Sequence, residues 1–175
     1  EFCNISGYND YELIDEQFVS LWHPEMPYIL HEILFESLNR REKLNIIVKM
    51  LAKDGRYFWV FATLDGKLND YGEIIGYYIH CKPVSKYAVQ QLVPLYHILK
   101  KIEEKSNNTH VSRRYIIGFL EEQKTNLNNY ITNLCKTYPV VDQMLPYEII
   151  KRVIIINPIN NNILYMVHQL HIIQM

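Results

Sequence analysis

The fold is decided by Lys53–Pro83, KDGRYFWVFATLDGKLNDYGEIIGYYIHCKP. Asp54-Gly55 is typical of a tight turn, because glycine adopts positive φ without steric cost. The residues that follow, Arg56–Leu64, are rich in the aromatic and β-branched side chains that favour a strand. A second turn signal at 69–72 leads to another apolar run, Ile74–Cys81. The stretch therefore predicts two adjacent antiparallel strands.

These strands are apolar on both faces. Side chains alternate along a strand, so Trp59 and Phe61 point to one face while Phe58 and Val60 point to the other. The run Leu44–Met50 supplies a third strand. Because a sheet that is apolar on both faces has to be covered, we expect an α+β fold in which short helices cover an antiparallel sheet.

Helices are predicted on either side of the strands. Gly7 is expected to end a first helix within Glu1–Glu16, and Ser85 to cap a helix that runs to about Lys105. The apolar spacing of Val111–Thr137 predicts one further helix, which forms a helical hairpin or a coiled-coil extension with its predecessor. A helix after Pro27 is predicted by residues at i, i+3, i+4 and i+8: Leu30, Ile33, Leu34 and Leu38.

The ordered set of motifs resembles the second half of a PAS sensory domain. The motifs are KDG–aromatic–WV followed by a GEIIGY strand that ends in KP. Upstream, EFCNISGYNDYEL and then WHPEMP are similar to the signature of the bacterial aerotaxis-receptor subgroup, and Val93–Tyr96 matches its Pro-Leu-Tyr stretch. The resemblance covers roughly Glu1–Glu104. It implies a PAS-like antiparallel sheet with a C-terminal helical extension.

The resemblance implies three regions. Residues 1–104 are a PAS-like domain without its usual first two strands, 105–137 are the helical extension, and 138–175 are a tail. Within the tail, 152–167 (RVIIINPINNNILYMV) reads as strand–turn–strand, because asparagine tolerates the left-handed region that a turn requires. One hypothesis is that this hairpin supplies the absent sheet strands, as in a permuted domain, or opens a truncated second copy. The alternative is that the tail is a poorly ordered extension.

A binding cavity is expected where the helices cover the concave face of such a sheet. An isoalloxazine ring requires an aromatic wall and hydrogen-bond donors, which His31 and Phe35 offer. The candidate cofactor-binding residues are Trp22, His23, His31, Phe35, Met50, Trp59 and Tyr77.

In the aerotaxis subgroup this cavity holds FAD, and the resemblance carries over residue by residue. The motif His-Pro-x-Met-Pro is retained from His23 to Pro27, while Trp22 replaces the subgroup's arginine and Glu25 its aspartate. His31 and Phe35 stand where the subgroup has flavin-contacting aromatic residues. Met50 stands where the subgroup has an asparagine that contacts flavin, so a polar anchor is lost.

Two functions follow from the resemblance. The first is a cytoplasmic sensory domain for signal transduction, in which bound FAD reports redox or energy state, as in aerotaxis and chemotaxis. The alternative is a cofactor-free interaction module that forms a homodimer or binds a signalling protein. Its surface would be the uncovered apolar face of Arg56–Leu64 together with the helices at 85–135.

Composition and motifs argue against other classes. The net charge of −1 offers no electrostatic surface for nucleic acid, and three widely spaced cysteines fit a reducing cytosol better than a disulfide or zinc framework. The most apolar segment, Val153–Met175, is interrupted by polar residues, so we expect no membrane insertion.

The sequence contains no known catalytic motif, so we expect that the protein is not an enzyme. His168 and His171 have metal-ligand spacing but no further ligand nearby, so no metal site is expected.

Overall fold

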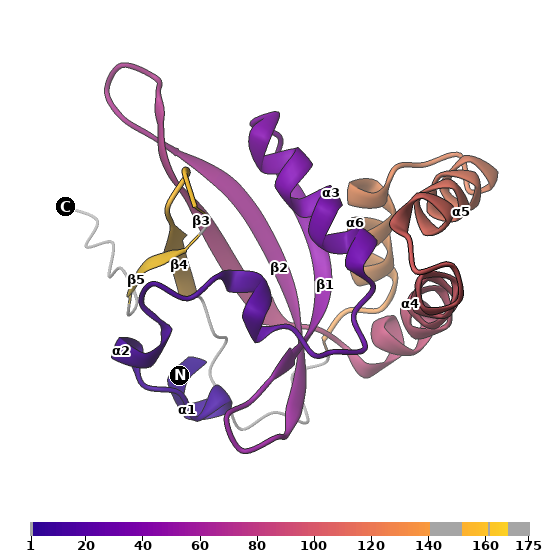
Figure 1. The fold of residues 1–175 in the computed structure, drawn as a ribbon, viewed down its shortest axis with the longest axis horizontal. Coiled ribbons are helices and arrows are strands. Elements are labelled where there is room, and N and C mark those ends of the chain that lie inside the picture. The colour runs from indigo at the N-terminus through magenta and orange to yellow at the C-terminus, as the bar shows by residue number, and fades with distance from the viewer. Residues whose placement is uncertain (1, 141–151, 161, 168–175) are drawn as a thin grey trace.

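The computed structural model describes residues 2–140, 152–160 and 162–167. Short helices precede the sheet, a helical bundle follows its third strand, and a hairpin ends the described chain (Figure 1). In chain order the elements are α1 (Phe2–Ser6), α2 (Asp10–Leu13), the 3-10 helix η1 (Phe18–Leu21), α3 (Tyr28–Asn39), β1 (Leu44–Leu51), β2 (Tyr57–Leu68), β3 (Ile74–Pro83), α4 (Lys86–Ser106), α5 (Thr109–Glu122), α6 (Leu127–Thr137), β4 (Arg152–Ile156) and β5 (Ile163–Val167).

The strands form one antiparallel sheet in the order β1-β2-β3-β4-β5. The predicted meander is present, with Ile47 opposite Phe61 and Lys49 opposite Trp59. His80 lies opposite Thr63, whereas its neighbour Cys81 faces the core and is buried. The predicted fold class, α+β with an antiparallel sheet covered by helices and a helical extension, is confirmed.

The segment 152–167 forms two strands that extend the sheet beyond β3. Tyr77 pairs with Ile156 and Cys81 with Arg152 across β3 and β4. The hairpin also reaches the N-terminal segment, because the Asp15 N–H donates to the Ile163 carbonyl at 2.9 Å and the Ile163 N–H to the Glu16 carbonyl at 2.8 Å. The C-terminal hairpin is therefore held by the sheet edge and by the loop after α2.

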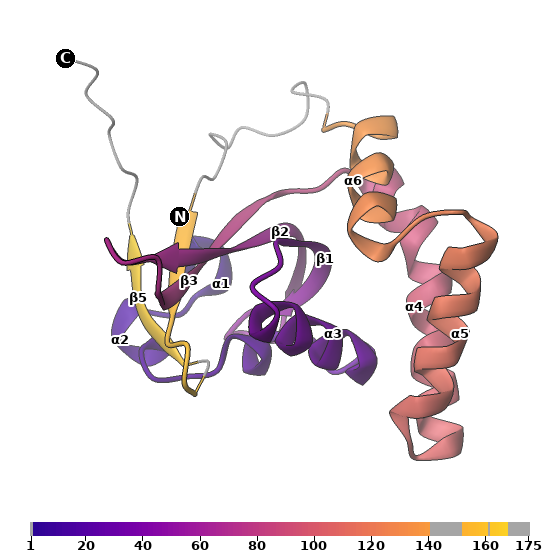
Figure 2. The same ribbon diagram turned by 90° about the horizontal axis from the view of Figure 1, so that it is seen from above.

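The inner face of the sheet packs against α3 and the segments before it. Figure 2 shows the sheet edge-on, with α1, α2 and α3 on one side and the α4–α6 bundle next to β1. The Tyr77 hydroxyl donates to the Leu38 carbonyl at 2.8 Å, which joins β3 to the end of α3. The inner core has fully buried side chains from α3 and from three strands: Ile29, Leu30, Ile46, Val48, Met50, Ala62, Leu64 and Ile79.

The outer face of β1 and β2 is covered by α4 and α6. Tyr96 of α4 stacks on Trp59, with ring centroids 6.5 Å apart, and its hydroxyl donates to the Ile47 carbonyl at 2.8 Å. The Asn45 N–H donates to Asn128 Oδ1 of α6 at 2.7 Å. The face of Arg56–Leu64 that we expected to be uncovered is thus partly occupied by the chain's own helices, so the expectation of an open face was wrong there.

Several helix ends follow the predicted signals. Gly7 ends α1 with φ of 74°, and the Ser85 hydroxyl accepts from the Ala88 N–H at the start of α4. The single helix expected over Val111–Thr137 was wrong, because α5 and α6 are separate. Lys124 adopts φ of 51° after α5, and the Asn126 side chain caps α6, so two local signals interrupt the apolar pattern.

Candidate functional site

Three of the predicted cofactor-binding residues meet on the inner face. Trp22 forms an isolated backbone bridge with Met50. The rings of Trp22 and His31 form an edge-to-face pair with centroids 4.5 Å apart. Met50 is 0% exposed and Trp22 is 5% exposed, so both belong to the core. The structure therefore places these residues together, inside packed protein.

The other predicted residues are more dispersed. Phe35 packs against the same core from α3, and Tyr77 is buried with its hydroxyl bonded to α3. The ring of His23 lies 5.7 Å from that of Tyr57, at the edge of the sheet. Trp59 is on the opposite face of the sheet, against Tyr96. The predicted residues consequently do not line one common pocket.

The group formed by Trp22, His31 and Met50 on the inner face has one feature that favours flavin binding and one that opposes it. Trp22 Nε1 and His31 Nε2 are buried without hydrogen-bond partners, and a polar ligand edge would satisfy them. Burial and the nearby charge of Lys100 lower the pKa of His31, which favours its neutral form. The strand side chains beside them are nevertheless fully buried in van der Waals packing. An isoalloxazine ring does not fit there without displacing the core.

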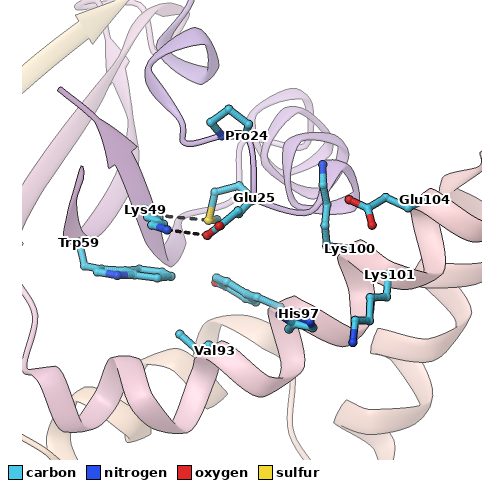
Figure 3. Close-up of a pocket in the computed structure, with 11 residues that line it drawn as sticks. Pro24, Glu25, Lys49, Trp59, Val93, His97, Lys100, Lys101 and Glu104 are labelled. Atoms are coloured by element: carbon cyan, nitrogen blue, oxygen red, sulfur yellow. Dashed lines mark hydrogen bonds and ion pairs between the residues drawn. The ribbon is translucent and has the colours of Figure 1, made fainter. Parts of the chain in front are cut away.

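A cleft of about 540 Å³ opens on the outer face, between α4, the first two strands and the loop before α3. Figure 3 shows Trp59 and Lys49 on the strand side and His97, Lys100 and Lys101 on the α4 side. The lining combines apolar and aromatic side chains with charged ones: Pro24, Glu25, Met26, Lys49, Trp59, Val93, Tyr96, His97, Lys100, Lys101 and Glu104.

Lys49 provides a buried cation at the strand side of this cleft. Its side chain is 10% exposed, and its Nζ lies 2.5 Å from Glu25 Oε2 and 3.9 Å from the centre of the Tyr57 ring. The hydrogen bond from Lys49 is the main cause that lowers the pKa of Glu25. Since Glu25 is 71% exposed, the pair joins a buried lysine to a carboxylate in solvent.

Sequence reasoning found only Trp59 among the cleft residues. A signal was present in the helix after Ser85, where His97, Lys100 and Lys101 follow the i, i+3, i+4 spacing that places side chains on one helix face. A charged helix end of this kind is typical of a solvated surface. The fold brings this surface over Trp59, which the sequence alone did not indicate.

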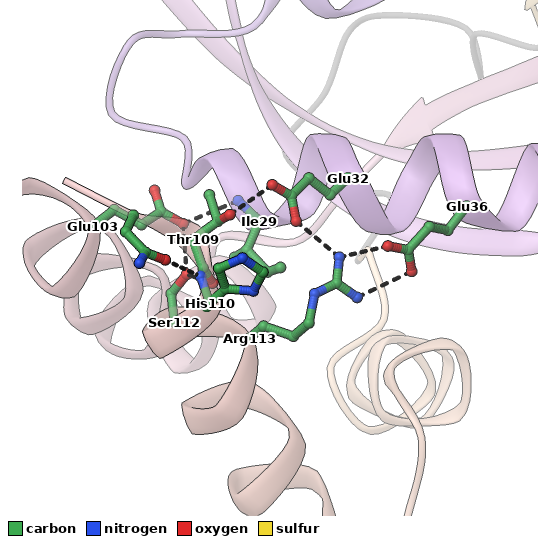
Figure 4. Close-up of polar contacts among 9 residues, drawn as sticks. Ile29, Glu32, Glu36, Glu103, Thr109, His110, Ser112 and Arg113 are labelled. Atoms are coloured by element: carbon green, nitrogen blue, oxygen red, sulfur yellow. Dashed lines mark hydrogen bonds and ion pairs between the residues drawn. The ribbon is translucent and has the colours of Figure 1, made fainter. Parts of the chain in front are cut away.

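A second polar cluster joins α3 to α4 and α5. The Glu103 carboxylate of α4 accepts from the N–H groups of Tyr28 and Ile29, at 2.7 and 2.9 Å, and from the Ser112 hydroxyl at 3.1 Å (Figure 4). Glu103 is 6% exposed. The first N–H groups of a helix have no partner within the helix and carry partial positive charge, so a carboxylate stabilises them. Glu103 thus caps α3 from a different helix.

Arg113 of α5 reinforces this junction. Its guanidinium donates to both carboxylate oxygens of Glu36, at 2.5 and 3.0 Å, and to Glu32 at 2.8 Å. The Thr109 hydroxyl also donates to Glu32, at 2.6 Å. These pairs raise the pKa of Arg113 and keep it charged. Helix α3 is therefore connected to α5 along its exposed side and to α4 at its beginning.

Residues 1–78 match the family model described as "PAS fold". The match runs from α1 into β3, so β4 and β5 lie outside it. The family model does not show whether the chain belongs to the aerotaxis-receptor subgroup. Comparison with curated proteins finds no match.

Solved structures of similar shape include light-oxygen-voltage (LOV) domains. The light-state structure of the blue-light photoreceptor Aureochrome1 LOV is 19% identical, covering 53% of this chain and 73% of its own, and the dark structure is 20% identical, covering 55% and 70%. A third, titled "Flavin Analogue Sheds Light on Light-Oxygen-Voltage Domain Mechanism", is 22% identical and covers 53% and 69%. Each has a TM-score of 0.49.

The described residues contain neither a metal-ligand cluster nor a membrane-spanning helix. No group of three or more His, Cys, Asp or Glu side chains among them is arranged to hold a metal ion. His168 and His171 lie outside the described residues. Within the described chain, no helix combines the length and apolar character needed to cross a membrane.

Proposed function

We propose that this chain is a PAS-type sensory module in which α3 and the sheet receive a signal and α4 and α5 pass it on. The observation that carries the proposal is the position of Glu103, which bonds the first turn of α3 and also Ser112 of α5. One buried carboxylate is shared by three helices. The three cysteines are unpaired, which suits a signalling protein of the cytosol.

The physical basis is a shift between two packings of the same helices. A displacement of α3 breaks the bonds from Tyr28 and Ile29 and leaves a buried carboxylate short of donors, which costs free energy. That cost is lowered if α4 and α5 move with α3. A ligand or partner that binds one arrangement more tightly then shifts the population of the other helices.

Hydrogen–deuterium exchange of Glu103→Gln tests this coupling. We expect faster exchange in Tyr28–Asn39 and also in Thr109–Glu122, because both lose the charged acceptor. The matched control is Glu104→Gln, the neighbouring exposed carboxylate. Faster exchange confined to α3, with α5 equal to the control, would show that the helices are not coupled through Glu103.

The packed inner core favours a signal that is another protein and not a bound cofactor. Met50, Ala62 and Ile79 are fully buried, so no ligand is needed to complete that core. In this form of the proposal the module forms a homodimer or binds a signalling partner. Sedimentation equilibrium measures whether the protein forms a homodimer. A dimer whose fraction rises with concentration supports self-association. A monomer at all concentrations up to about 100 µM means that the module binds a different protein.

Redox sensing through FAD, as in aerotaxis, is the second candidate. The unpartnered Trp22 Nε1 and His31 Nε2 favour it, because a flavin edge offers hydrogen-bonding groups. This candidate requires the buried side chains beside them, such as Met50, to move aside for the ring. The visible absorption spectrum of the purified protein, followed by analysis of acid-released cofactor, decides between the two. Flavin bands in stoichiometric amount support FAD sensing. A colourless protein that does not take up added FAD eliminates it.

A further inference from the structure

We propose that the outer cleft between α4 and the first two strands is a binding site for a planar aromatic anion of the nucleoside monophosphate class. The cleft is on the face of the sheet opposite to the expected cofactor cavity. The proposal does not depend on the sensory function. It is based on three features of the cleft: its aromatic wall, its cations and its volume.

The aromatic wall is the indole of Trp59, which is held in place by the buried Tyr96. Their rings are inclined by 30° with centroids 6.5 Å apart, and Tyr96 is fixed by its hydrogen bond to the Ile47 carbonyl. Trp59 is held in a regular strand opposite Lys49 and is half-buried, so part of the indole faces the cleft. Tyr96 is only 3% exposed, so the half-buried Trp59 is the ring that can stack on the π-face of a nucleobase, and such stacking is possible with any base.

The cations lie on the α4 side, across the cleft from Trp59. Lys100 and Lys101 come from one turn of α4, with His97 one turn earlier (Figure 3). Neither lysine forms an ion pair with a described residue, although Lys100 Nζ lies 4.5 Å from the centre of the Tyr28 ring. Lys49 is already paired with Glu25. The lysines outnumber the glutamates of the lining, so the cleft favours an anion. Figure 3 shows the Lys100 and Lys101 side chains pointing in different directions, so one phosphate meets both ammonium groups only after a side chain changes rotamer.

The volume also fits this ligand class. At about 540 Å³ the cleft lies within the range of small-molecule sites, and it is open on one side, so a ligand can enter without unfolding the helix. A neutral aromatic compound would leave Lys100 and Lys101 without an anion, and a sugar phosphate without a base would leave the aromatic wall unused. Both parts of the ligand are therefore required.

Isothermal titration calorimetry with AMP and UMP tests the proposal, with adenosine and ribose 5-phosphate as the two incomplete ligands. We expect saturable binding of at least one nucleotide at 50 mM salt, and affinity at least tenfold lower for both incomplete ligands. Absence of heat for both nucleotides up to millimolar concentration would overturn the proposal, as would equal binding of AMP and adenosine.

A matched pair of lysine variants locates the site. Lys100→Ala with Lys101→Ala should weaken nucleotide binding at least tenfold, whereas Lys86→Ala with Lys105→Ala, on the same helix outside the cleft, should leave it unchanged. These exposed or half-exposed side chains are outside the core, and circular dichroism verifies that both variants remain folded. Equal affinities of the two variants would place the nucleotide elsewhere and contradict the assignment.

Discussion

Glu103 of α4 accepts a hydrogen bond from the backbone N–H of Ile29, at the first turn of α3, although the two residues are 74 positions apart. The N–H of Tyr28 donates to the other oxygen of the same carboxylate. Helix α3 begins after Pro27, which contributes no side-chain cap. The cap that its own sequence lacks is therefore supplied by the helical extension.

Replacing Glu103 by Gln should lower the free energy of unfolding by about 1–3 kcal/mol, since hydrogen bonds to a charged acceptor lose strength when the charge is removed. Urea denaturation measures the change. Glu104→Gln is the control and should stay within about 0.5 kcal/mol of wild type, because its side chain is exposed. Equal effects of the two substitutions would mean that the cap has no energetic role.

Tyr96→Phe should destabilise the protein by about 1–2 kcal/mol. The substitution keeps the ring on Trp59 but removes the buried hydroxyl that donates to the Ile47 carbonyl. Burial also raises the pKa of Tyr96, so the hydroxyl is protonated at neutral pH and able to donate. The same urea experiment on Tyr87→Phe, at an exposed position of α4, should show almost no change; a similar loss in both would contradict the prediction.

Arg113→Lys should cost less than about 1 kcal/mol at low salt, because the side chains of Glu32 and Glu36 are 41% and 43% exposed and solvent screens them. The loss arises from the two-point contact with Glu36, which an ammonium cannot reproduce. We expect the difference from wild type to shrink in 1 M NaCl. A difference that is unaffected by salt would indicate that packing of the arginine stem, and not charge, is responsible.

Stability should fall as the pH is lowered from 7.5 to 5.5, and His31 should account for part of the fall. Burial lowers the pKa of His31 from its ordinary 6.5. The unfolded chain therefore binds more protons than the folded one below pH 6.5, so acid favours unfolding. His31→Phe should reduce the pH dependence of the urea midpoint.

Carboxylates contribute little between pH 7.5 and 5.5, because their ordinary pKa values lie near 4. If His31→Phe and wild type lose the same stability over this range, titration of His31 is not involved.

The sequence predicted local features well and long-range contacts poorly. The strands around Trp59 and the cap at Ser85 follow from residues that are adjacent in sequence, and both are present. The contact of Trp59 with Tyr96 depends on where α4 packs, which the apolar pattern of either segment does not specify. For the same reason Trp59 was assigned to the inner cavity, and the cap that Glu103 forms on α3 was not predicted.

The C-terminal hairpin shows the same limit. The sequence RVIIINPINNNILYMV predicted its two strands. It did not predict whether these strands pair with the rest of the sheet. The structure pairs β4 with β3 and ties Ile163 to the loop after α2. Pairing between segments so distant in sequence is decided by the unsatisfied edge of β3, which needs hydrogen-bond partners.

Residue-resolved hydrogen exchange of the hairpin tests the central claim, that the C-terminal strands complete a PAS-like sheet. The account predicts slow exchange for paired amides of Arg152–Ile156 and Ile163–Val167, approaching that of the central strand β2, and faster exchange of Tyr77–Cys81 when the chain is truncated at residue 151. Rapid exchange throughout the hairpin, with β1, β2 and β3 protected both in the full chain and in the truncated one, would contradict it.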